Sequence, residues 1–134
     1  MKLALILLSI LGLTWSQQLE CHCGLFATVD HMSVYEVYRL LPLNLNSCDE
    51  LNECSFFCFA EWDLVYTNGG LDYIPPGETL TVGEQSCINL NEVHGVPDME
   101  PTPLYNYYRV CDGPWIFDGG VSNNDLCCAN GVQC

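Results

Sequence analysis

The chain has 134 residues, with 17 acidic residues against three lysines and arginines, so its formal net charge at pH 7 is −14. A surface of this sign repels phosphate backbones and anionic lipid headgroups, which excludes nucleic acid as a partner. Ten cysteines in so short a chain are typical of a secreted domain held by disulfides, and an even number predicts five bridges with no free thiol. The cysteines are Cys21, Cys23, Cys48, Cys54, Cys58, Cys87, Cys111, Cys127, Cys128 and Cys134.

The first 16 residues have the order of a secretory signal peptide: Lys2, then an apolar run over 3–13, then small residues up to Ser16. The run is shorter than the roughly 18 apolar residues of a membrane span, so we expect cleavage and no membrane insertion after it. Cleavage after Ser16 would leave a single disulfide-rich extracellular domain, 17–134, which we expect to be secreted. With two arginines against 17 acidic residues, its formal charge would be −15.

The first predicted element of this domain is a short helix over 33–41. Ser33 and Glu36 fit a capping box, and the apolar residues that follow keep a helical spacing. Pro42 would end the helix, because proline cannot continue it. The β-branched residues of the segment also permit a strand.

The main helix is predicted over 48–66. Ser47 and Glu50 form a second capping box, and an Asn-Gly-Gly sequence follows the segment as a stop signal. Cys54 and Cys58 are four residues apart and therefore project from one face of the helix. We expect each to bridge to a different partner segment rather than to ligate a metal.

The second half of the chain is predicted to be extended. Residues 79–82 alternate polar and apolar side chains, and a second strand is expected around 86–90. Three prolines make 97–103 irregular and exposed. Strand-forming residues at 104–111 and an apolar run at 115–117 then predict a hairpin.

These elements predict an α+β fold. One or two helices in the first half would pack on a small antiparallel sheet from the second half, with disulfides holding the layers together. The aromatic residues of the hairpin are expected to fill a small core against the main helix. The alternative is an exposed ligand platform, and the candidate interaction surface consists of Tyr105, Tyr107 and Trp115.

The spacing of the N-terminal cysteines argues against metal and redox chemistry. Cys21 and Cys23 flank His22 with one-residue spacing, whereas structural zinc sites use C-x2–4-C. The C-x-x-C motif of thiol oxidoreductases does not occur. We expect Cys21 and Cys23 to point to opposite faces of an extended chain and to take separate partners.

The C-terminal cysteines raise a similar question. A trans peptide holds neighbouring Cα atoms closer together than a disulfide prefers, so Cys127 and Cys128 are expected to bond to two separate segments of the body. Asn130-Gly131 would turn the chain so that Cys134 reaches a third segment. Truncation after Leu126 should then leave three unpaired cysteines and prevent secretion.

No motif for hydrolysis is present: G-x-S-x-G and H-E-x-x-H are both absent, and the three histidines are scattered. We therefore predict no catalytic residue, no cofactor and no bound transition metal. Calcium is the strongest of the remaining site hypotheses. Asp112-Gly113 and Asp118-Gly119 could place carboxylates on adjacent turns, although no EF-hand pattern occurs and such pairs are more often plain turns.

The two ends of the chain resemble a known family. The sequence C-H-C-G-L-F at 21–26, Trp115, the sequence L-C-C-A-N-G at 126–131 and the final Cys134 are similar to the arthropod follicle cell proteins. Those small secreted proteins also begin with C-x-C-G-x-F and end with a tryptophan, C-C-x-N-G and a last cysteine. The resemblance implies an extracellular protein of the egg chamber or another epithelium, with no enzymatic activity.

The function expected from the sequence is a non-catalytic extracellular binding or matrix role of eggshell type. The expected partner is another extracellular protein, one with basic character. A secreted inhibitor or toxin-like effector of an enzyme or receptor is the first alternative. A calcium-dependent matrix component is the second.

Overall fold

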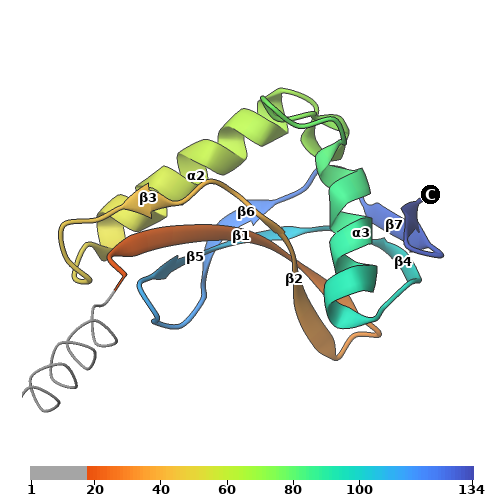
Figure 1. Ribbon diagram of the computed structural model, residues 1–134, viewed down its shortest axis with the longest axis horizontal. Helices are drawn as coiled ribbons and strands as arrows, with labels where there is room; N and C mark the ends of the chain where they lie inside the picture. Colours follow the sequence, from red (N-terminus) through yellow and green to blue (C-terminus); the bar gives the residue numbers. More distant parts are fainter. Residues whose placement is uncertain (1–17) are drawn as a thin grey trace, which may run out of the picture.

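The computed structural model describes residues 18–134, so the predicted signal peptide lies outside the described residues. The predicted α+β class is confirmed: two helices pack on antiparallel sheets (Figure 1). Five disulfides cross-link the domain, and three of them join a helix to a strand. The strands are β1 (Glu20–Val29), β2 (Ser33–Arg39), β3 (Leu43–Asn44), β4 (Met99–Thr102), β5 (Tyr105–Val110), β6 (Ile116–Val121), β7 (Leu126–Ala129) and β8 (Val132–Gln133). The helices are α2 (Leu51–Thr67) and α3 (Val82–His94), with a 3-10 turn, η1 (Gly70–Asp72), between them.

The larger sheet has the order β2-β1-β5-β6, with β3 paired to one end of β1, and the smaller sheet has the order β4-β7-β8. Helix α2 lies across one face of the larger sheet, while α3 packs beside β2 and the smaller sheet (Figure 1). The core lies between these layers and contains side chains from both helices and from β1.

Strand β1 is the centre of the larger sheet, which corrects the prediction of a sheet drawn from the second half alone. Its side chains at Cys21, Cys23, Leu25 and Ala27 are fully buried. Successive side chains of a strand alternate between faces, so these four line the same face, toward α2. The intervening residues are also covered, and β1 therefore lacks the apolar–polar alternation that would mark it in the sequence.

The predicted helix over 33–41 is wrong, because this segment forms β2. The backbone turns at Asp30 and His31, where φ is +55° and +61°, and β2 then runs back along β1. Its β-branched and aromatic residues suit a pleated strand. Glu36 does not cap a helix; its carboxylate accepts two hydrogen bonds from Arg39, at 2.6 and 2.8 Å.

The main helix is confirmed, with a start three residues later than predicted. The carboxylate of Glu50 accepts the backbone N–H groups of Asn46 and Ser47, so the predicted capping box orders the turn before α2 rather than its first turn. The helix ends at Asn68, whose N–H closes the last turn onto the carbonyls of Leu64 and Val65. Its buried side chains are Cys54, Cys58, Trp62 and Val65.

The predicted strands over 79–82 and 86–90 are wrong, because this segment forms the N-terminal cap and the body of α3. Thr81 accepts the N–H of Glu84 at 3.0 Å, and the Glu84 carboxylate accepts the N–H of Thr81 at 3.2 Å. This reciprocal pair is a complete capping box. Gly95 closes the other end in the left-handed conformation, at φ +69°.

The hairpin at the end of the chain is confirmed as β5 and β6, with two changes. The predicted turn at 118–120 lies inside β6 as a bulge, since Tyr107 pairs with Phe117 and Tyr105 pairs with Val121. The segment 97–103 is also more ordered than predicted. It contains β4, an edge strand that tolerates its proline, and Met99 in it is buried.

Candidate functional site

The three residues predicted as an interaction surface come together on the face of the larger sheet away from α2. Residues opposite one another in paired strands share a face. Arg39 of β2, Gly24 of β1, Tyr107 of β5 and Phe117 of β6 are opposite one another in that order, which makes one row across four strands. We call this side of the sheet the outer face.

Aromatic rings cover the outer face. The ring centroid of Phe26 lies 4.8 Å from that of Tyr107 and 5.1 Å from that of Trp115. The ring centroid of Phe117 lies 5.5 Å from that of Tyr107 and 5.9 Å from that of Tyr105. Tilted and edge-on aromatic pairs at these separations are favourable beyond the area that they bury. These rings lie on the face away from α2, which corrects the prediction of an aromatic core against the main helix. Tyr105, Tyr107 and Trp115 are half-buried, and Phe117 is exposed.

The ring of Trp115 comes close to the backbone of β1 at Gly24, which has no side chain. A Cβ atom at Gly24 would lie 3.3 Å from the Trp115 ring and 3.1 Å from Phe26. Because Gly24 lacks a Cβ atom, the loop that carries Trp115, just before β6, can pack onto the sheet. The sequence analysis did not select Phe26 or Phe117. Phe117 lies two residues after Trp115 in the same predicted run, which was a signal for it, whereas Phe26 lies in β1, where no strand was predicted.

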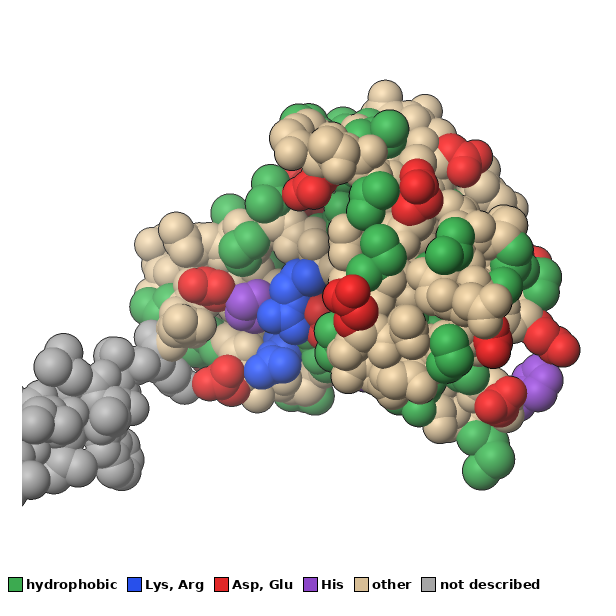
Figure 2. All heavy atoms as spheres, turned by 45° about the vertical axis from the view of Figure 1, so that its right-hand side comes forward, with side chains coloured by type: hydrophobic (Ala, Val, Ile, Leu, Met, Phe, Trp, Pro, Cys, Tyr) green, Lys and Arg blue, Asp and Glu red, His purple; other side chains and the backbone are tan. Residues whose placement is uncertain are grey.

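Both arginines of the described chain flank Trp115. The guanidinium carbons of Arg39 and Arg109 each lie 5.5 Å from the centre of its ring, within the range of cation–π attraction. Arg39 also pairs with Glu36, and Arg109 contacts the Asp112 carboxylate at 3.3 Å. Figure 2 shows the two cationic side chains side by side, next to a histidine and bordered by acidic groups.

The histidine of this cluster is His22, which lies opposite Arg109 in the sheet. Burial and then the positive charge of Arg39 lower the pKa of His22 below its ordinary value. Its Nε2 atom lies 3.6 Å from the Glu20 carboxylate, and its Nδ1 atom is buried with no hydrogen-bond partner in the described chain. The outer face therefore gathers aromatic rings with two arginines, each of which is paired with a carboxylate.

The opposite, α2-facing side of the sheet contains a polar pair of one buried and one half-buried residue, Asn106 and Asp118. The side-chain amide of Asn106, which is fully buried, donates hydrogen bonds to the Cys58 carbonyl and to the carboxylate of Asp118. Asp118 also accepts the N–H of Gly120 at 2.8 Å. Burial nevertheless raises the pKa of Asp118 above its ordinary value, against the opposing effect of these hydrogen bonds.

This pKa shift predicts a pH-dependent contribution to stability. A carboxyl whose pKa is raised on folding stabilises the protein fully below the unfolded value of 3.8, and that stabilisation is lost as the pH rises through the folded value. Asp118→Asn keeps an acceptor for Gly120 but cannot ionise. We expect its free energy of unfolding, relative to wild type, to rise between pH 3 and pH 7 in urea titrations.

The control for this experiment is Asp118→Ala, which also cannot ionise and should show the same pH-dependent change relative to wild type. It leaves the Gly120 N–H and one N–H of the Asn106 amide without an acceptor, so it should be less stable than Asp118→Asn by about 1–3 kcal/mol at every pH. A constant difference between Asp118→Asn and wild type at every pH would contradict the raised pKa.

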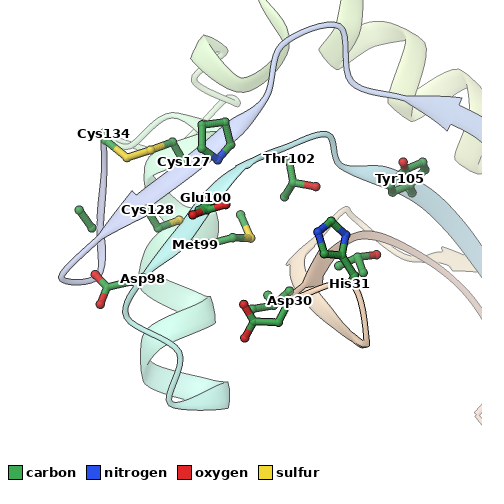
Figure 3. Close-up of a pocket in the computed structure, with 14 residues that line it drawn as sticks. Asp30, His31, Asp98, Met99, Glu100, Thr102, Tyr105, Cys127, Cys128 and Cys134 are labelled. Atoms are coloured by element: carbon green, nitrogen blue, oxygen red, sulfur yellow. A yellow bond between two sulfur atoms is a disulfide. The ribbon is translucent and has the colours of Figure 1, made fainter.

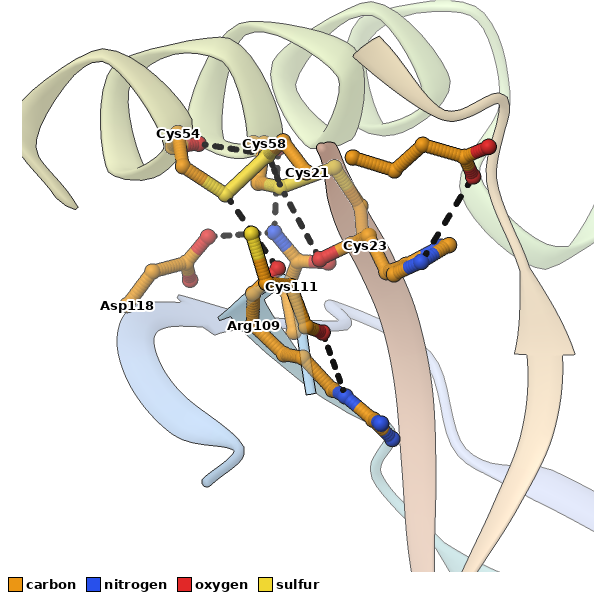
Figure 4. The surroundings of a disulfide bond; sticks show 10 residues. Cys21, Cys23, Cys54, Cys58, Arg109, Cys111 and Asp118 are labelled. Atoms are coloured by element: carbon orange, nitrogen blue, oxygen red, sulfur yellow. Dashed lines mark hydrogen bonds and ion pairs between the residues drawn. A yellow bond between two sulfur atoms is a disulfide. The ribbon is translucent and has the colours of Figure 1, made fainter. Parts of the chain in front are cut away.

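All ten cysteines are paired, as predicted. Two neighbouring bonds, Cys21–Cys54 and Cys23–Cys58, join β1 to α2 (Figure 4). Two sequence expectations are therefore corrected. Residues i and i+2 of a strand point to the same face, so both β1 cysteines face α2 rather than opposite sides. The two helix cysteines accordingly bridge to one segment rather than to two.

The spacing of these four cysteines matches the geometry of the two elements. Two residues along a strand span roughly 6.6 Å, and four residues along a helix span roughly 6.0 Å. A C-x-C strand and a C-x3-C helix can thus form two bonds side by side when the helix follows the strand. The spacings C-x-C and C-x3-C are both present in the sequence, but the sequence analysis did not connect them into two parallel bonds.

The other three bonds are Cys48–Cys111, Cys87–Cys128 and Cys127–Cys134. The prediction that Cys127 and Cys128 take different partners is confirmed. The prediction of three bonds from the tail to the body is wrong, because Cys134 bonds back to Cys127 across the Asn130–Gly131 turn. Truncation after Leu126 would thus leave Cys87 unpaired, not three cysteines.

The described residues also show how the candidate metal ligands are placed. The sulfurs of Cys21, Cys23 and Cys58 lie within 4.8 Å of one another, but all three belong to disulfides and none is the thiolate that ligates a metal. The two carboxylates suggested for calcium engage separate partners: Asp112 contacts Arg109, and Asp118 accepts from Asn106.

Within residues 18–134, no helix is long and apolar enough to cross a membrane. Comparison of the chain with family models, with curated proteins and with solved structures gives no match, so the resemblance to arthropod follicle cell proteins stays a prediction.

Proposed function

We propose that this is a secreted, non-catalytic binding protein of the extracellular space that holds a protein partner on its outer face. The observation that supports the proposal is the gathering of tyrosine, tryptophan and arginine side chains on one sheet face. These residue types dominate the energetic centres of protein interfaces. The described chain has two arginines, and both flank Trp115.

The disulfide framework supports the same proposal in two ways. Five bridges suit an oxidising, extracellular setting. They also hold β1 and α2 in a fixed relation, so the rings on the outer face are ordered before a partner arrives. A pre-ordered surface loses less conformational entropy on binding.

A binding role of this kind fits the matrix or eggshell setting that the sequence resemblance implies. It also fits the alternative of a secreted inhibitor, since an inhibitor needs the same kind of rigid contact surface. The identity of the captured partner separates these two.

Affinity capture from extracellular fluid tests the proposal. The immobilised protein is compared with a Tyr107→Ala, Phe117→Ala double variant, which removes rings from the outer face without changing charge. Truncation of interface hot spots costs about 2 kcal/mol or more, so partner recovery should fall at least about tenfold.

The matched control is Phe56→Ala, Phe59→Ala, since these two rings of α2 are 78% and 50% exposed. Recovery should be unchanged in this control. Loss of the partner in the α2 variant, with normal recovery in the outer-face variant, would move the interface to α2 and reject the proposal. Capture of an enzyme through its active site would favour the inhibitor alternative.

A further inference from the structure

The larger sheet divides at one end of β1. The pairing of β1 with β5 stops at Phe26 opposite Tyr105. Beyond that point, residues 27–29 of β1 pair with β2 alone, and β4, which precedes β5 in the chain, pairs with β7 alone. Each of these two segments therefore has one strand edge without a partner among the residues described.

The division has a local cause. The next position after Tyr105 is Leu104, whose N–H and carbonyl both bond to Ser122, at 2.8 and 2.9 Å. Pro103 and Pro101 come next, and neither has an N–H to donate to β1. The chain therefore cannot continue the ladder, and β4 turns toward the smaller sheet.

A cleft of about 1010 Å³ lies between the two edges. One wall is the end of the β1–β2 hairpin, at 28–31, and the other is β4 with the neighbouring part of β7 (Figure 3). Its volume is at the upper end of the range for ligand sites. The cleft is open to solvent at strand edges, which favours an extended occupant over a compact one.

The walls of the cleft are acidic. Asp30 belongs to the hairpin wall, and Asp98 and Glu100 belong to the β4 wall, with His31 nearby (Figure 3). None of the lining residues is a lysine or an arginine, since Arg39 and Arg109 both lie at Trp115. An occupant with positive charge is thus complementary to the cleft and is attracted by the net charge of the chain.

We propose that this cleft binds an extended, basic peptide segment of a protein partner as an added strand. The backbone of the segment would bond to the unpaired edges of β1 and β4, as in other cases of strand addition. Its lysine or arginine side chains would meet the three carboxylates. The inference rests on the proposed binding function and names the chemistry of the partner.

The cleft adjoins the outer face through Tyr105. This side chain lines the cleft and also contacts the ring of Phe117. A partner held on the outer face can therefore extend a strand into the cleft without leaving the surface of the protein. A second copy of this chain is a poor occupant, because the described chain has no segment with neighbouring basic residues.

A synthetic peptide tests the proposal. The probe has seven residues with blocked ends, in which lysine alternates with threonine or valine. Titration with the intact protein is followed by calorimetry and by amide hydrogen exchange. We expect saturable binding and slower exchange of amides in 27–29 and in Met99–Thr102.

Two further peptides separate backbone recognition from charge. N-methylation of alternate amides, at odd or at even positions, keeps every charge but removes hydrogen bonds from one edge. Each version should bind at least about tenfold more weakly. Equal binding of the N-methylated peptides would mean adsorption by charge alone and would overturn the proposal.

Protein variants locate the site. Asp30→Asn, Asp98→Asn and Glu100→Gln together keep size and hydrogen-bond acceptors, and Asn tolerates the positive φ at position 30. This triple variant should bind the probe about tenfold more weakly. The matched control neutralises Glu53, Glu61 and Asp63 of α2, and it should bind the probe as wild type does.

Three further outcomes would change the interpretation. If calcium alone slows the hydrogen exchange of the same amides and displaces the peptide, the cleft is a cation site and the proposal fails. If the peptide binds normally to the Tyr107→Ala, Phe117→Ala variant while partner capture is unaffected by that variant, the outer-face function fails and the cleft stands. Protection confined to the outer face would reject the cleft alone.

Discussion

Replacement of Cys21, Cys23, Cys54 and Cys58 together by alanine is expected to remove most of the stability of the protein. The two bonds close nearly the same loop, with sequence separations of 33 and 35 residues, and opening that loop removes about 4 kcal/mol of chain-entropy stabilisation. All four cysteines are fully buried, so the variant also leaves unfilled volume in the core. Domains of this size have only about 5–15 kcal/mol in total. Guanidinium unfolding of the purified protein measures the effect.

The Cys127→Ala, Cys134→Ala variant is the control for this loss. Its bond spans seven residues and ties the tail to itself, so the corresponding entropic loss is about 2.4 kcal/mol. Neither side chain belongs to the fully buried set, and the control should keep most of the stability of the wild-type protein. An equal loss in the two variants would contradict the role assigned to the two β1–α2 bonds.

Substitution of Gly120 by alanine is the second change with a large expected effect. A Cβ atom at this position would lie 2.6 Å from the Trp62 ring and 3.0 Å from its Nε1 atom. Trp62 is only 4% exposed and is held within the core, so the ring has little room to move. Overpacking of this kind costs about 1–3 kcal/mol, which urea unfolding would detect.

Gly83→Ala provides the comparison, because a Cβ atom at this position would also lie very close to a neighbouring side chain. The new Cβ atom would meet the end of the Gln133 side chain, which is flexible and can rotate away. Gly83 lies within α3, where alanine favours the helix by up to about 1 kcal/mol. We expect this variant to be neutral or more stable. Equal destabilisation of the two glycine variants would show that the rigidity of Trp62 is not what matters.

The sequence predicted the local features of the fold better than the long-range ones. The main helix, its stop after Thr67 and the β5–β6 hairpin follow from capping, turn and strand-forming residues close to one another. The capping box at Thr81 and Glu84 and the glycine at position 95 were also present in the sequence. A four-residue alternation at 79–82 was too short a pattern to outweigh them.

The remaining features depend on pairing between distant segments. Residues 33–39 are a strand because β1 lies beside them, and their own spacing suits either a helix or a strand. The outer face likewise forms only when four strands align Arg39, Gly24, Tyr107 and Phe117. The sequence selected Tyr105, Tyr107 and Trp115 by residue type, but it could not place the two arginines beside them.

The paired bonds between β1 and α2 fix the position of the helix along the strand. If α2 moved by one turn, Cys54 would lie opposite Cys23, and Cys21 and Cys58 would each lose their neighbour. Complete oxidation is therefore compatible with a single alignment of helix and strand. In the folded protein the sulfurs of Cys21 and Cys58 lie 3.6 Å apart, so a wrong pairing is geometrically close to the native one. Disulfide formation can thus select the correct packing. A misaligned chain keeps two free thiols, and these can exchange with the wrong disulfide until helix and strand are correctly aligned.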